Sequence, residues 1–252
     1  MNVLRAEWTK LRSVRSTWIA ALSAVAAGVA LSVLGASDLL GTSASDLPAG
    51  WDPTTESLKG FLFAQLIIGM LGALSVTPEF GTGMIGTSLV FVPSRSRLLA
   101  AKATVVAAIG LVVSLVTTML SFGVVQLMLK GARLPGAGLG DAGVARALIS
   151  GTLYLTLVAL LGVSIGALVR SATSSLALLV GALLLVPALG PGLPGALGDW
   201  FGKYWPITAG QAAYTAVPTD DMIAPGLGLF ILAVAAAATI VASHVRFRVR
   251  DI

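Results

Sequence analysis

The chain has 252 residues, of which 56% are apolar and only 11% are charged. Because an ordinary soluble domain carries about 25% charged residues, this composition excludes that class and indicates an integral membrane protein. The chain has no cysteine, which excludes a disulfide framework and a metal site built from thiolates.

The first 18 residues, MNVLRAEWTKLRSVRSTW, are too polar to enter the hydrocarbon layer. Within them, apolar side chains recur at helical spacing with arginines beside them, which predicts an amphipathic helix over residues 1–16 lying on the membrane surface. The residues that carry this pattern are Leu4, Trp8, Leu11, Arg5 and Arg12. The alternative is an unstructured basic segment that only directs topology.

Six apolar runs follow, and each approaches the roughly 20 residues that cross a ~30 Å hydrocarbon layer as a helix. The expected spans are Thr17 to Ala36, Gly60 to Val76, Ala103 to Leu129, Ala147 to Val169, Ser175 to Leu189 and Pro225 to His244. The first run exceeds the roughly 7–15 apolar residues of a signal peptide, so it is expected to remain as a helix. We therefore expect an all-α integral membrane protein with a single transmembrane domain over residues 1–252.

Lys and Arg are unevenly divided between the two sides of these spans. With the N-terminus in the cytoplasm, 11 of the 16 basic residues but only three of the 11 acidic residues lie inside. This bias predicts a multi-pass plasma-membrane protein with both termini in the cytoplasm. The net charge of +5 then reflects membrane orientation, and no nucleic-acid partner is expected.

Residues 77–102, between the second and third spans, read TPEFGTGMIGTSLVFVPSRSRLLAAK. Gly81, Gly83 and Gly86 match GxGxxG, a dinucleotide-binding pattern that needs a βαβ unit and an acidic residue about 20 positions further on. After Glu79 the next acidic residue is Asp141, so no nucleotide site is expected. The proline and acid at the start of the segment fit the first turn of a short helix, and its glycines suit close docking against another protein.

The five residues GVSIG, from Gly162 to Gly166, fit two patterns. As GxSxG they match a nucleophile elbow, which needs a histidine and an acid near Ser164, yet the only histidine, His244, lies at the end of the last span. As GxxxG, Gly162 and Gly166 allow membrane helices to approach closely, and helix packing is the preferred interpretation. An intramembrane hydrolase that uses Ser164 is the alternative.

We expect no catalytic residue, no cofactor and no metal site. The centres of the six spans carry no charged residue, which argues against a self-powered pump. The chain has no GxxxxGK[ST] phosphate-binding loop, so a partner must supply the energy for any transport.

The segment before the last span, residues 187–224, is apolar but broken by prolines and contains Trp200, Tyr204 and Trp205. It is too long for a tight turn and too interrupted to cross the membrane. We expect re-entrant or interfacial half-helices, which are tolerated where protein covers them. A surface loop with an aromatic anchor is the alternative.

Three parts of the chain together resemble the ABC-2 type permeases, the membrane subunits of ABC exporters. They are the leader AEWTKLRSVRSTW, the loop EFGTGMIGTSLVFVPSRSRLLAAK and the broken segment before the last span. The resemblance implies an elbow helix, a coupling segment over residues 77–102 and an outer gate over residues 187–224. The residues it assigns to coupling with an ATPase are Glu79, Phe80, Gly81, Gly83, Met84, Gly86, Arg95 and Arg97.

Such a permease is a homo- or heterodimer of membrane subunits served by separate cytoplasmic ABC ATPase subunits, which bind the ATP. The resemblance therefore implies efflux of a hydrophobic drug, peptide or lipid-like substrate across a bacterial plasma membrane. The alternative function is a membrane anchor or assembly subunit that transports nothing and recruits a cytoplasmic partner.

Overall fold

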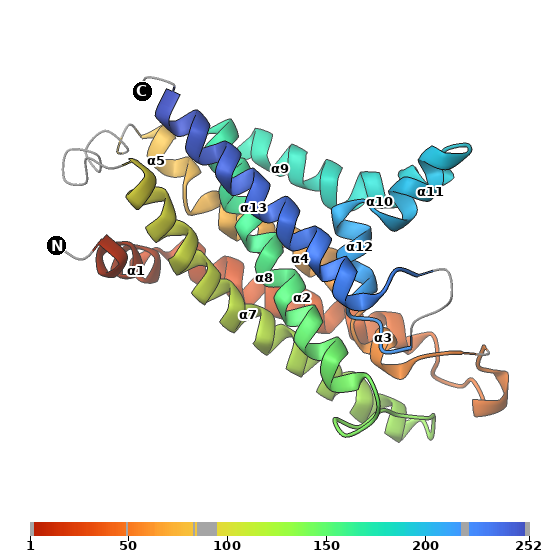
Figure 1. Cartoon of the computed structure of the whole chain (residues 1–252). Helices are drawn as coiled ribbons and strands as arrows, with labels where there is room; N and C mark the ends of the chain where they lie inside the picture. Colours follow the sequence, from red (N-terminus) through yellow and green to blue (C-terminus); the bar gives the residue numbers. More distant parts are fainter. Residues whose placement is uncertain (1–2, 49, 83, 85–94, 218–221, 250–252) are drawn as a thin grey trace.

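A computed structural model describes residues 3–48, 50–82, 84, 95–217 and 222–249 (Figure 1). About 80% of it is helical, and its described part contains no strand. The helices are α1 (Val3–Ser13), α2 (Arg15–Ser37), α3 (Pro53–Ser57), α4 (Phe61–Leu74), α5 (Thr77–Gly81), α7 (Arg95–Gly131), α8 (Val144–Val169), α9 (Ala172–Val180), α10 (Val186–Leu189), α11 (Ala196–Lys203), α12 (Pro206–Ala212) and α13 (Pro225–Val249).

Five stretches of the described chain are long and apolar enough to cross a membrane. They are Arg15–Ser37, Ser96–Gly131, Val144–Val169, Ala172–Gly192 and Pro225–Arg246. Each coincides with one of the predicted spans, which confirms an all-α integral membrane protein. The fifth predicted span is longer than expected because α9 continues through a π-helical turn, Gly181–Leu185, into α10.

The second predicted span differs, because α4 has only 14 residues. At 1.5 Å per residue it is about 21 Å long, shorter than the ~30 Å hydrocarbon layer. The chain leaves the helix at Val76, which has φ −122° and ψ −45°, and then enters α5. Because α4 packs against α2, α8 and α9, protein covers much of this short helix, although Leu62 and Phe63 in its first turn are exposed.

Glycines allow α4 and α8 to approach until their backbones touch. A Cβ atom added to Gly162 would lie 1.9 Å from the carbonyl oxygen of Gly69, and one added to Gly72 would lie 2.1 Å from that of Ala159. Gly166, one turn further along α8, also faces α4. Small residues at such a crossing permit the close packing that joins membrane helices.

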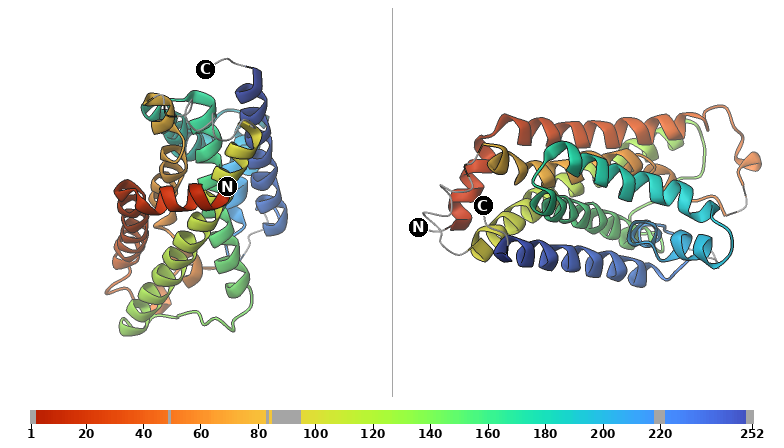
Figure 2. Two further views of the ribbon diagram at one scale, coloured as in Figure 1. Left: turned by 90° about the vertical axis from the view of Figure 1, so that its left-hand side faces the viewer. Right: turned by 90° about the horizontal axis from the view of Figure 1, so that it is seen from above.

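Both chain ends, α1, α5 and the start of α7 lie at one end of the bundle, which we call the basic end (Figure 1). There α1 lies crosswise to the long helices (Figure 2). Basic residues of its helices are Arg5, Lys10, Arg12, Arg15, Arg95, Arg97, Lys102, Arg246 and Arg248.

Hydrogen bonds join the loops at the opposite, distal end. The carboxylate of Asp52 accepts the backbone N–H groups of Thr54 at 2.9 Å, Thr55 at 3.2 Å and Ala216 at 3.2 Å. Burial raises the pKa of Asp52, but the hydrogen bonds from Thr55, Thr54 and Ala216 outweigh it, so the pKa lies below its ordinary value of 3.8. Asp52 thereby holds the start of α3 to the chain that follows α12.

The described part of the predicted gate region holds the short helices α10, α11 and α12 and the 3₁₀ turn Gly190–Gly192. Among them, α12 lies against the long helices. Ile207, Ala209 and Gly210 of α12 are buried, and this helix packs against α13 and α8. By contrast, Trp200 and Leu197 on α11 are exposed. The segment is therefore helical and only partly covered by the rest of the chain.

Candidate functional site

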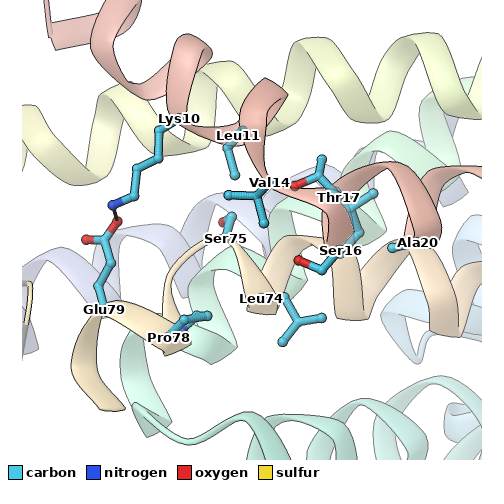
Figure 3. Close-up of a pocket in the computed structure, with 11 residues that line it drawn as sticks. Lys10, Leu11, Val14, Ser16, Thr17, Ala20, Leu74, Ser75, Pro78 and Glu79 are labelled. Atoms are coloured by element: carbon cyan, nitrogen blue, oxygen red, sulfur yellow. Dashed lines mark hydrogen bonds and ion pairs between the residues drawn. The ribbon is translucent and has the colours of Figure 1, made fainter. Parts of the chain in front are cut away.

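Two lysines and two glutamates from three helices meet at the basic end, and we call them the ion cluster: Glu7, Lys10, Glu79 and Lys102. The Nζ atom of Lys102 donates to Oε2 of Glu7 at 2.8 Å and also to Oε1 of Glu79. Lys10 pairs with the same Glu79 oxygen (Figure 3). The side chains of Lys102, Glu79 and Glu7 are buried, with only 2%, 4% and 7% exposed, whereas that of Lys10 is 34% exposed.

The local sequence determines where each charged residue of the cluster lies on its helix. On α1, Glu7 and Lys10 are three residues apart and therefore share a face, and Leu11 beside them is buried in the apolar core. Lys102 lies two turns into α7, within the apolar sequence LLAAKATVV. Pro78 favours the start of a helix here. Glu79 therefore lies in the first turn of α5.

The ion cluster is electrically balanced, with two positive and two negative side chains. Moving a charge out of water costs several kcal/mol, and a buried pair offsets this cost only when its partners remain in place. Separation of α1, α5 and α7 would leave Lys102 and both carboxylates buried without partners. The cluster therefore favours joint movement of these three helices.

A small cavity of about 100 Å³ lies beside the Lys10–Glu79 pair (Figure 3). One wall comes from the bend between α1 and α2, around Val14, and the other from α4 and α5, around Leu74 and Pro78. The ion pair between Lys10 and Glu79, which both line the cavity, connects α1 to α5.

Two of the residues predicted to contact an ATPase face the interior. Glu79 belongs to the ion cluster, so its carboxylate contacts this chain's own lysines. Phe80 packs against the apolar core, and the guanidinium carbon of Arg170 lies 4.9 Å from the centre of its ring. Such a cation–π contact joins α5 to the end of α8. Glu79 and Phe80 are thus placed to hold α5 in position.

Other predicted contact residues face outward at the basic end. Gly81 and Met84 are exposed, and among the described residues a Cβ atom added to Gly81 would meet nothing within 4 Å. Arg97, in the first turn of α7, is exposed as well. The remaining residues of this prediction lie outside the described part of the chain, and they are Gly83, Gly86 and the side chain of Arg95.

The apolar stripe predicted on the leader is divided in the folded chain. Leu4 and Trp8 are exposed, and so are Arg5 and Arg12. Leu11 is buried against the bundle. The helix therefore presents one face to the protein and another, rich in arginine, to its surroundings.

The residue pattern did not identify Glu7 and Lys102 as site residues. They are 95 positions apart, so no local spacing connects them. The available signal was the position of Lys102 inside an apolar run near a helix end, where a buried lysine requires an acidic partner.

Two buried polar residues inside the bundle, Ser164 and Gln65, form hydrogen bonds within it. The hydroxyl of Ser164 donates to the carbonyl of Leu160 at 2.8 Å, and Gly162 to Gly166 lie within helix α8 rather than at the strand-to-helix turn of a nucleophile elbow. The amide of Gln65 accepts from the hydroxyl of Tyr154 and donates to the carbonyl of Leu183 at 3.2 Å. These contacts join α4, α8 and the π-helical turn.

The sequence model of one family, described as ABC-2 family transporter protein, matches residues 3–187. This range covers more than half of the chain, contains the whole ion cluster and ends within α10. No curated protein matches the chain. With a membrane-spanning helical bundle and a match of this length, the chain belongs to the ABC-2 family of transporter proteins.

Proposed function

We propose that this chain is the permease subunit of an ATP-driven ABC exporter, and that it pairs with a second permease copy and a separate cytoplasmic ATPase. Its membership of the ABC-2 family supports a permease role in ABC transport. The chain lacks a GxxxxGK[ST] loop of its own, which fits ATP binding by a partner. Its substrate would be a hydrophobic drug, peptide or lipid-like molecule.

The buried position of Lys102 between Glu7 and Glu79 is the observation that carries this proposal. An ATPase that docks on the exposed surface at Gly81 and Met84 would push on α5. The ion cluster would pass that displacement to α1 and α7, because rigid-body movement keeps the buried charges paired whereas sliding separates them. The long helices would then move with the ATPase.

The proposed orientation puts the basic end in the cytoplasm, and cysteine labelling tests it in a chain that has no native cysteine. Thr82 at the basic end and Ser45 at the distal end are both exposed. In intact cells an impermeant maleimide should label Ser45→Cys and leave Thr82→Cys unlabelled until the cells are lysed. The reverse pattern would place the proposed docking surface outside the cell and contradict the proposal.

A large side chain at an exposed glycine of the proposed docking surface tests whether the ATPase docks there. Gly81→Trp should reduce recovery of the ATPase with the purified permease at least tenfold and abolish transport, because the indole would occupy the docking surface. The matched control is Gly140→Trp at the distal end, where a Cβ atom also meets nothing within 4 Å. Pull-down of the ATPase and substrate efflux from vesicles are the measurements.

Three outcomes separate the proposal from its rivals. Retention of the ATPase and of efflux in Gly81→Trp would contradict docking at this surface. Equal losses in Gly81→Trp and Gly140→Trp would show a general folding defect and contradict it too. A complex that keeps its ATPase but moves no substrate and shows no substrate-stimulated ATP hydrolysis would indicate an anchor or assembly subunit.

A further inference from the structure

A second hollow lies on another side of α1 from the cavity beside Lys10. It is a groove of about 290 Å³ between α1, the first turns of α2 and the middle of α7. Its walls are mainly apolar and include Trp8 and Arg12 of α1, Trp18 and Ala21 of α2, and Ile109 and Val113 of α7. The volume is near the lower limit of small-molecule pockets, about 300 Å³.

A hydrogen bond at the bend between α1 and α2 helps to form the groove. The indole Nε1 of Trp18 donates to the carbonyl of Arg12 at 2.8 Å, and Val14 between the two helices is extended, with φ −85° and ψ 120°. This bond holds the ring of Trp18 at the groove while 55% of the residue stays exposed. The Trp18 ring therefore forms part of the groove wall.

The chemistry of the groove changes along its length. Ile109 and Val113 lie seven and 11 residues beyond Lys102, which is about 10 to 16 Å further along α7 and within a stretch long enough to span the membrane. Arg12 contributes a cation from α1 at the basic end. In the described part of the chain no carboxylate forms an ion pair with Arg12. A cation followed by an apolar channel matches a phosphate followed by a hydrocarbon tail.

The position and charge of the groove favour a lipid as its occupant. Its α7 wall lies in a stretch long enough to span the membrane, where lipid surrounds the protein. Its other residues are mainly apolar, and Arg12 adds a cation at the basic end. This combination suits an anionic headgroup joined to an acyl chain.

We infer that this groove is a binding site for one anionic phospholipid. The guanidinium of Arg12 would hold the phosphate, with the exposed indole of Trp8 beside it, and one acyl chain would lie against Ala21, Ile109 and Val113. A lipid bound there would fill the space between α1 and α7. The inference rests on the groove alone and does not depend on the proposed transport function.

Native mass spectrometry of the full chain tests the site. The protein would be released from vesicles of phosphatidylcholine with a minor share of phosphatidylglycerol, and the lipids that remain bound to each chain would be counted. We expect one retained phosphatidylglycerol. Arg12→Gln should lower the preference for phosphatidylglycerol roughly fivefold, since one basic side chain near an anionic surface contributes ~1 kcal/mol.

Two further variants distinguish specific lipid binding in the groove from nonspecific attraction between anionic lipid and basic residues. Arg5→Gln removes the same charge from the same helix at a position that does not line the groove, so it should retain lipid as the parent does. Ala21→Phe should fill the groove and reduce retention of both lipids at least tenfold. Circular dichroism and the elution volume of each variant would verify that it is folded.

Several results would overturn the inference. They are no retained lipid in the parent, equal losses in Arg5→Gln and Arg12→Gln, or full retention in folded Ala21→Phe. A lipid-free dimer that dissociates on Ala21→Phe substitution would instead assign the groove to a second copy of the chain.

Discussion

Replacing Lys102 with methionine should destabilise the folded chain by about 3–5 kcal/mol, the usual cost of removing one partner from a buried ion pair. Lys102 is 2% exposed and is the partner of Glu7, whereas Glu79 would keep Lys10. The substitution therefore leaves the Glu7 carboxylate buried beside an apolar side chain. Thermal or denaturant unfolding in detergent would measure the loss.

Two variants give this experiment its controls. Lys130→Met removes the same charge from the other end of α7, where the side chain is exposed, and should change stability by less than about 0.5 kcal/mol. Adding Glu7→Gln to Lys102→Met removes the unpaired carboxylate and should recover part of the loss. Equal stability of Lys102→Met and Lys130→Met would show that the ion cluster does not hold α1 to α7.

Replacing Gly162 with alanine should also destabilise the bundle, although it adds a single methyl group. The new Cβ would lie 1.9 Å from the carbonyl oxygen of Gly69, so α4 and α8 would have to move apart. Overpacking costs about 1–3 kcal/mol and more where the backbone must move, and we expect a cost at or above the upper value. The midpoint of thermal unfolding in detergent would measure it.

Gly123→Ala is the matched control for this prediction, and its effect should have the opposite sign. Gly123 lies within α7, and a Cβ atom there meets nothing within 4 Å. Alanine is favoured over glycine inside a helix by roughly 0.5–1 kcal/mol, so this variant should be neutral or more stable. If Gly162→Ala were equally harmless, the backbone contact between α4 and α8 would not limit stability.

Properties that depend on neighbouring residues were predictable from the sequence. Long apolar runs are sufficient to predict membrane helices, because burial of the backbone in hydrocarbon requires about 20 apolar residues in a row. Five runs accordingly became helices of membrane length. The amphipathic pattern of the leader likewise predicted a helix, and α1 covers Val3–Ser13.

The short α4 shows where that reasoning stops. Its apolar run suggested a span from Gly60 to Val76, but the helix ends at Leu74 because the chain turns into α5. Apolar residues avoid water both where they face lipid and where they face other helices. Apolar character alone therefore does not tell these two environments apart. Only the packing of α2, α8 and α9 around α4 distinguishes the two environments.

The ion cluster and the α4–α8 contact were decided by tertiary structure. Glu79 follows a proline at a helix start, which locally favours an acid, yet its environment depends on Lys102, 23 residues away, and on Lys10, 69 residues away. Gly162 belongs to a visible GxxxG pattern, but its partner Gly69 lies on another helix. Hydropathy and helical periodicity act over a few residues, and they therefore determined the membrane class and the helices of this protein. The pairing of buried charges and the meeting of backbones require separate helices to pack at a particular angle and depth, which only the folded bundle determines.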